Sequence, residues 1–194
     1  MAYDPSSMLS WAALWASMVD VAYDQTYRTM QVRPSDNCTC FDCSSFTFFA
    51  MWLGGGLDVG ALGYSTDLSK YRSIPRTANA WTVNGMVNKL RQLGWVQVGS
   101  NVNDWHIGDI LVKTSTHTEI VYSLSPLQSV GAHGTGGGSI PIPDQVSIRA
   151  ISNPAYYDQV WRDPTSPTPP GPTPRPHGHM PVWLLKKALE GGKF

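Results

Sequence analysis

The hydrophobic pattern of this chain predicts an α+β fold, in which N-terminal helices pack on an antiparallel β-sheet. Before Gly94, apolar side chains recur at the spacing of helices; after it, they form short β-branched runs that turn residues separate. Hydrophobic residues make up 42% of the 194 residues, which is enough for one domain with a buried core.

Helical periodicity marks three segments of the first half. The expected helices cover residues 8–22, 42–53 and 79–93. The first would be capped by Ser6 or Ser7, and its Trp11 and Trp15 belong to an apolar stripe that we interpret as core. Between the first two helices we expect a polar loop over residues 24–41. Glycines follow the second and third helices, which indicates where both end.

Five short strands are expected in the second half, at residues 95–98, 109–113, 118–122, 129–132 and 145–151. After them, residues 163–181 consist mainly of Pro, Thr and Gly, a composition typical of an extended linker. We therefore expect one folded domain over residues 1–162 and, after the linker, a short basic amphipathic tail over residues 182–194.

Charge and hydropathy argue against several classes of function. Lys and Arg together number 14, as do Asp and Glu, so the formal net charge is zero, whereas a general nucleic-acid-binding protein needs a basic face. No run of the chain approaches the roughly 18 apolar residues of a membrane span. The N-terminus also lacks the basic start of a signal peptide. We expect no nucleic-acid partner, no membrane span and no signal peptide.

The segment DCSSF at residues 42–46 places Cys43 in the first turn of an expected helix. Unpaired N–H groups and the helix dipole favour negative charge there, and so favour a thiolate nucleophile. The same N–H groups can hold the oxyanion that forms when the thiolate attacks a carbonyl. Cys38 and Cys40 lack this setting, and we interpret them as incidental thiols. The alternative for Cys43 is a small buried thiol that packs the helix.

A base for this nucleophile is expected on the strands. In the run HTEIVY at residues 117–122, His117 and Glu119 share one face of a strand. At the start of a core strand, His117 could meet Cys43; the alternative is an ordinary surface histidine of a hairpin. His133 follows the next strand and could fix the imidazole, which would complete a set of nucleophile, base and orienting residue.

Two other chemistries draw on the same residues. The three cysteines, with His106 or His117, could bind zinc, but their spacing lacks the paired Cys-x-x-Cys knuckles of structural zinc sites. Serine catalysis is disfavoured because the chain has no Gly-x-Ser-x-Gly elbow. We therefore expect neither a metal nor a cofactor. As a base, His106 is a weaker candidate than His117, since it lies in a turn before a strand.

The segments DCSSF (42–46), GDIL (108–111) and HTEIVY (117–122), in this order, resemble the NlpC/P60 cysteine peptidases. The amidase family of bacteriophage lysins is more similar still. The likeness extends loosely from the first helix to about Trp161 and leaves out the linker and the tail. It implies a papain-like α+β fold and cleavage of bacterial peptidoglycan, either at the N-acetylmuramoyl-L-alanine amide or within the stem peptide.

The resemblance also implies roles for residues of this chain. The site carried over is Cys43 as nucleophile, His117 as base, His133 as third residue, Tyr27 near the oxyanion hole, and Asp42 and Glu119 as supporting residues. Glu119 departs from the pattern of many NlpC/P60 members, which have Gly two residues after the base. Lysin amidases are more tolerant of an acid at this place, so the departure leaves the subfamily and the cleaved bond open.

A phage lysin of this kind is made in the host cytoplasm and reaches the cell wall after release, either through a holin or from a virion. Peptidoglycan would be its partner, and the sequence does not indicate an oligomeric state. Two alternatives remain open. One is a catalytically inactive wall-binding or virion structural module of the same fold, and the other is a peptidase or acyltransferase that acts on another amide.

Overall fold

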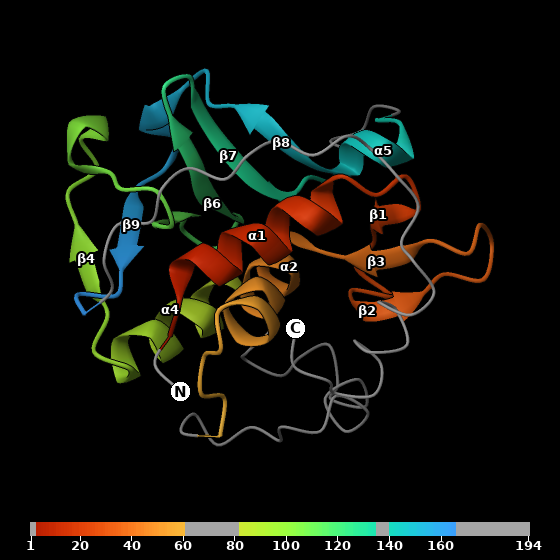
Figure 1. Cartoon of the computed structure of the whole chain (residues 1–194), viewed down its shortest axis with the longest axis horizontal. Helices are drawn as coiled ribbons and strands as arrows, with labels where there is room; N and C mark the ends of the chain where they lie inside the picture. Colours follow the sequence, from red (N-terminus) through yellow and green to blue (C-terminus); the bar gives the residue numbers. More distant parts are fainter. Residues whose placement is uncertain (1–2, 61–81, 135–139, 166–194) are drawn as a thin grey trace.

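The computed structural model describes residues 3–60, 82–134 and 140–165. Within them the chain is α+β, as the sequence predicts, with helices packed on a sheet of antiparallel strands (Figure 1). The tail and most of the expected linker lie outside the described residues, so the domain boundary at residue 162 stays a prediction. No helix of the described part is both long enough and apolar enough to cross a membrane.

Helix α1 (Pro5–Ala16) begins and ends earlier than the sequence predicts. Its N-cap is Asp4, not Ser6 or Ser7, because the Asp4 side chain accepts a hydrogen bond from the Ser6 N–H at 2.9 Å. The proline that follows suits the first helical position, where its fixed φ favours the helix and its missing N–H has no intrahelical acceptor to lose. The end of the apolar stripe is not helical, since Val21–Tyr23 form strand β1.

The expected loop over residues 24–41 contains two strands, β2 (Thr29–Val32) and β3 (Thr39–Phe41). With β1 they form a small sheet, in which β3 lies in the middle, parallel to β1 and antiparallel to β2. Strands of three or four residues are too short to show an alternating pattern, which is why the sequence does not predict them. This small sheet matters to the site because β3 leads directly into Asp42, the cap of the next helix.

Helix α2 (Cys43–Phe49) begins where the sequence predicts and continues as a π-helical turn, η1 (Ala50–Gly54). Gly54 permits a close approach of the first helix, because a Cβ there would lie 2.6 Å from the Cβ of Trp11. Helix α4 (Val83–Gln92) lies within the third predicted helical segment.

The main sheet has six antiparallel strands in the described part of the chain, in the order β4-β9-β5-β6-β7-β8. Their bounds are Val96–Val98 (β4), Ile110–Lys113 (β5), His117–Leu124 (β6), Leu127–Ala132 (β7), Val146–Ala150 (β8) and Gln159–Arg162 (β9). The sequence predicts all but β9, which comes last in the chain and yet pairs with both β4 and β5. It also misses the short helix α5 (Ile142–Gln145) and the 3-10 turns η3 (Val102–Asp104) and η4 (Pro154–Tyr156).

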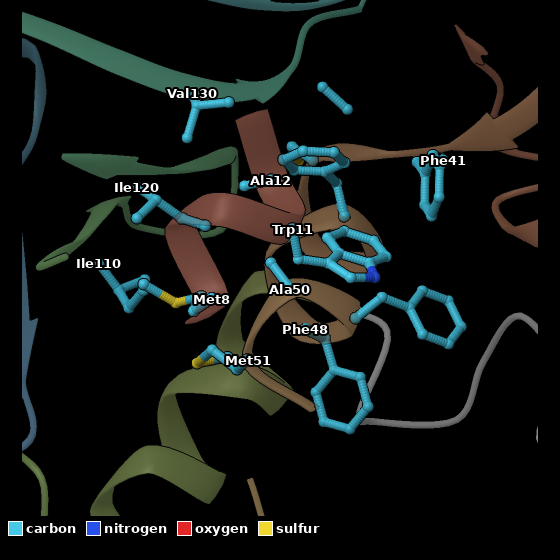
Figure 2. Packing of buried hydrophobic residues seen from close by; sticks show 14 of the residues in the cluster. Met8, Trp11, Ala12, Phe41, Phe48, Ala50, Met51, Ile110, Ile120 and Val130 are labelled. Carbon is cyan, nitrogen blue, oxygen red and sulfur yellow. The ribbon is translucent and has the colours of Figure 1, made fainter. Parts of the chain in front are cut away.

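The main core fills the space between the helices and one face of the sheet (Figure 2). Trp11 and Trp15 lie in it with exposed fractions of 4% and 0%, which confirms that the aromatic stripe is core. A smaller cluster around Trp105 covers the opposite face. Neighbouring strand residues therefore serve different layers: on β6, Ile120 packs in the main core and Val121 in the smaller cluster.

An ion pair with a buried carboxylate joins β9 to the residue that precedes β5, and it offers a test of the fold. The Arg162 guanidinium, on β9, donates from Nε and Nη2 to the two oxygens of Asp109, at 2.7 and 2.6 Å. The Asp109 side chain is 1% exposed, so Arg162→Met would leave a buried carboxylate without its cation. We expect a loss of about 3 kcal/mol in the free energy of unfolding. For a domain of this size that corresponds to a melting temperature lower by roughly 6–12 °C.

The control for this measurement is Arg91→Met. Arg91 lies on the exposed side of α4, with its guanidinium 5.1 Å from the ring centroid of Trp161. An exposed cation–π contact contributes only about 0.5–1 kcal/mol. Equal melting temperatures for the two variants would contradict the structural role of the Arg162–Asp109 pair.

Candidate active site

Cys43 is the first residue of α2, and the turn that carries it is held from several sides. Asp42 and Ser45 form a capping box, in which Asp42 Oδ1 accepts from the Ser45 N–H at 2.8 Å and Ser45 Oγ accepts from the Asp42 N–H at 2.9 Å. The Asp42 carboxylate also accepts from Arg28 Nη1 at 2.8 Å. Asp42 therefore supports the site by fixing the helix start, and it leaves the first-turn N–H of Cys43 beside the thiol.

The hairpin between β5 and β6 brings the predicted base to this helix. His117 is the first residue of β6, and the carbonyl oxygen of the preceding Thr116 lies 4.0 Å from Cys43 Sγ. Two anchors hold the hairpin turn: Asn84, on α4, bonds both the side chain and the N–H of Ser115, and Asp158 accepts from the Thr114 N–H at 2.9 Å. These hydrogen bonds fix the turn from which His117 begins β6.

Glu119 connects the two predicted histidines. His117 Nε2 lies 2.7 Å from Glu119 Oε1, and His133 Nδ1 lies 3.0 Å from the same oxygen. Because Nε2 is engaged, Nδ1 is the ring nitrogen of His117 that remains available, and the interaction with Cys43 contributes to the raised pKa of His117. The residue that orients the imidazole is thus Glu119 itself, whereas the sequence suggested His133 for this role. His133 lies one step behind, with its Nε2 3.2 Å from the Ser147 carbonyl oxygen.

The second oxygen of Glu119 is bonded as well. Oε2 accepts from the Tyr157 hydroxyl at 2.7 Å and from the Ser129 hydroxyl. Burial would raise the pKa of Glu119, but the hydrogen bonds and positive charges of the two histidines hold this pKa well below its ordinary range. The carboxylate is therefore ionised, almost fully buried, and bonded through both oxygens, which fixes its orientation and that of His117.

The electrostatics of His117 follow from this arrangement. Burial lowers its pKa, yet the hydrogen bonds with Cys43 and Glu119 and the charges of both outweigh burial and raise the pKa to about 9. The imidazole consequently holds its proton at neutral pH. A protonated imidazole next to a thiol at a helix start is the setting that stabilises a thiolate, and it can later give its proton to a leaving group.

Gly131, which sequence reasoning missed, makes room for this network. Pairing of Ile120 with Val130 places Gly131 opposite Glu119 on the neighbouring strand. A Cβ on Gly131 would lie 2.9 Å from Glu119 Cγ, so only glycine lets the carboxylate side chain cross over β7 toward both histidines. The one available signal was the isolated glycine within a predicted strand, which often marks a close approach.

The other predicted residues lie elsewhere. Tyr27 packs with Cys38 and Cys40 in a small cluster around β1 and β3, whereas Cys43 belongs to the main core. Tyr23 is a tyrosine whose electrostatics are coupled to the thiol: burial raises its pKa, and the charge of Cys43 raises it further. His106 lies in the turn before β5, where its N–H donates to Asp109.

Spacing suited to a metal ion occurs at His117, Glu119 and His133, which offer ligand atoms that all lie within 4.8 Å of one another. Within the described residues this group contains none of the cysteines, so the three-cysteine zinc site that the sequence left open finds no support. Both oxygens of the carboxylate in this group, Glu119, already have hydrogen-bond partners within the protein, so the carboxylate is satisfied without a metal ion.

The pKa of His117 tests the role of Glu119. Glu119→Gln keeps the size of the side chain but removes its charge, so the pKa of His117 should fall from about 9 toward its ordinary value. NMR titration of the His117 ring protons, assigned by their loss in His117→Asn, measures this. Tyr157→Phe removes one hydrogen bond and leaves the charge of Glu119, so its shift should be the smaller one. An unchanged pKa in Glu119→Gln would contradict the network.

Gly131→Ala should displace the Glu119 side chain and, through it, His117. We expect the alkylation of Cys43 by iodoacetamide at pH 7 to slow by roughly tenfold, since small misplacements of a reacting pair are costly. Gly99→Ala is the matched control, because the atom nearest to its Cβ would be the end of the Asp104 side chain, at 3.1 Å, and the Asn101 N would lie at an ordinary contact distance of 3.9 Å. The same slowing in both variants would mean that Gly131 has no special part in the site.

No family model, no curated protein and no solved structure matches this chain. What the site can do is therefore read from its own residues: a thiol at a capped helix start, a protonated imidazole against it, and a buried carboxylate that orients the imidazole.

Proposed function

We propose that this chain is a cysteine hydrolase that cleaves an amide bond of bacterial peptidoglycan, on a papain-like fold of the NlpC/P60 type. The observation that carries the proposal is the set formed by Cys43, His117 and Glu119. The residue before His117 approaches Cys43 Sγ to 4.0 Å with its carbonyl oxygen, and His117 Nε2 lies 2.7 Å from Glu119 Oε1. Nucleophile, base and orienting residue in this geometry are the parts of a thiol hydrolase.

The reaction would proceed in two steps. The Cys43 thiolate attacks the amide carbonyl carbon, and the negative charge moves to the carbonyl oxygen, next to the Cys43 N–H. When the C–N bond breaks, the amine leaves with the proton of His117, and a thioester remains on Cys43. His117 then takes a proton from water, the hydroxide attacks the thioester carbonyl carbon, and the C–S bond breaks, which releases the acid product and restores the Cys43 thiolate beside protonated His117.

Tyr23 takes the place in this proposal that the sequence gave to Tyr27. Its hydroxyl is close enough to Cys43 for the two charges to interact, and its raised pKa keeps it protonated at neutral pH. A protonated hydroxyl can donate to the oxyanion together with the Cys43 N–H. Gln25 Nε2 donates to this hydroxyl at 3.2 Å, which leaves its proton for another acceptor.

The substrate class rests on the three segments that resemble lysin amidases. These segments carry Cys43, the β5 start and His117, and so coincide with the elements that build the site. The scissile bond would be the N-acetylmuramoyl-L-alanine amide or a bond of the stem peptide. The chain would reach the wall after release from the host cytoplasm or from a virion.

Metal-dependent hydrolysis is the second candidate, favoured by the spacing of His117, Glu119 and His133. In that case His117 would be a ligand rather than a base, and Cys43 would be dispensable. Treatment with EDTA separates the two: a thiol hydrolase keeps its activity, whereas a metal hydrolase loses it and regains it with added Zn²⁺.

Substitution of the thiol tests the proposal directly. Cys43→Ala should lower the release of soluble fragments from purified peptidoglycan by on the order of 10³-fold or more, because it removes the nucleophile. Mass spectrometry of the fragments would identify the cleaved bond. A catalytically inactive wall-binding or structural module would instead release no fragments in either form, and full activity of Cys43→Ala would rule out thiol chemistry.

The neighbouring cysteines supply the matched controls, Cys38→Ala and Cys40→Ala. Burial raises the pKa of both thiols, that of Cys40 to about 12, so neither is a thiolate at neutral pH. Both variants should keep the activity, and iodoacetamide should inactivate the protein in step with the labelling of Cys43 alone.

A further inference from the structure

A cavity of about 300 Å³ opens on the sheet face that carries Glu119. The residues of its wall that matter here are Glu119, His133, Arg149, Asn153, Tyr156 and Tyr157. Strands β7 and β8 supply one side, and the segment around η4, between β8 and β9, supplies the other.

This cavity adjoins the proposed site. Glu119 and His133 belong both to the cavity wall and to the network that orients His117. The ring centroid of Tyr156, on the far wall of the cavity, lies 6.5 Å from the ring centroid of His117, so the cavity lies next to the proposed base. A group bound in the cavity would thus belong to the same molecule whose amide meets Cys43.

The charges of the wall favour an anion. Arg149 stands opposite Ser129 on the sheet; its Nε donates to Ser147 Oγ at 3.0 Å, and its Nη2 donates to the Asp144 carbonyl. Within the described residues no carboxylate pairs with Arg149, and its hydrogen bonds to them come from Nε and Nη2. The acid of the wall, Glu119, is already bonded through both oxygens and does not compete for the guanidinium.

We propose that this cavity is a substrate subsite for a residue that carries a free carboxylate, with Arg149 as the residue that recognises it. The inference rests on the proposed function and adds the chemistry of the substrate. Peptidoglycan offers such a group beside the candidate amides, because the glutamate of the stem peptide is linked through its side chain and keeps its α-carboxylate. An arginine fork suits a carboxylate, whereas the neutral carboxamide found in amidated walls cannot form the ion pair.

The test uses two soluble disaccharide-peptides that differ only in this group, carboxylate in one and carboxamide in the other. For the unchanged protein, we expect kcat/KM to be roughly ten- to a hundredfold higher for the carboxylate, mainly through KM, as for a charge-assisted hydrogen bond. Arg149→Gln should bring cleavage of the carboxylate substrate down toward that of the carboxamide substrate. Arg149→Lys, which keeps a point charge, should retain part of the preference.

Two further variants keep the test decisive. Arg149 also bonds the segment around α5, so its loss could disturb folding; Asn153→Asp instead adds a negative charge to the cavity wall and should abolish the preference with Arg149 in place. Lys113→Gln is the matched control, because Lys113 Nζ lies 5.9 Å from the Tyr156 ring, outside the cavity wall. It should leave the preference unchanged.

The outcomes separate the two proposals. Equal cleavage of both substrates by the unchanged protein, or equal effects of Arg149→Gln and Lys113→Gln, would overturn the subsite and leave the hydrolase standing. Cleavage of neither substrate, or cleavage of both by Cys43→Ala, would overturn the proposed function itself.

Discussion

The Glu119 carboxylate is the constraint on which the site depends. A buried ionised carboxylate is costly unless donors surround it. Here two imidazoles and two hydroxyls do so: two of the donors lie on β6 and β7, one directly follows β7, and one directly follows η4. All four donors are thereby held by the two oxygens of Glu119. If one donor is removed, the remaining three no longer satisfy the buried charge of this carboxylate. Glu119 therefore bears on both stability and the proposed chemistry: its charge must be satisfied by these partners, and the same carboxylate orients the proposed base, His117, and raises the pKa of His117.

The proposed nucleophile comes from the other layer of the fold. Cys43 belongs to the core between the helices and the sheet, while Glu119 lies on the face with the smaller cluster around Trp105 and Tyr157. His117 can reach both because it is at the end of its strand, where the hairpin turns. Asn84 and Asp158 form hydrogen bonds with residues of this turn, and these bonds hold His117 in place between the two layers.

The sequence predicted the parts of this site that have a local signature. An acid before a cysteine at a helix start predicted α2, and alternation on β6 predicted that His117 and Glu119 share a face. Contacts between distant segments had no such signature. Whether Glu119 or His133 touches His117, and whether Tyr23 or Tyr27 lies near Cys43, depends on strand register and on a small sheet whose strands are too short to show a pattern. Strand β9 was missed for a similar reason, because four residues surrounded by turn formers give little periodicity.

The place of β9 in the sheet has a consequence for the order of assembly. As the chain leaves the ribosome, β4 and β5 emerge before β9, the strand that lies between them in the sheet and pairs with both. Asp158, which holds the hairpin of His117, emerges with it. The fold thus relies on contacts between residues far apart in the chain, which form slowly. A nascent chain therefore carries Cys43 and His117 before Asp158 and β9 are present, and the site is complete only when almost the whole predicted domain has been made.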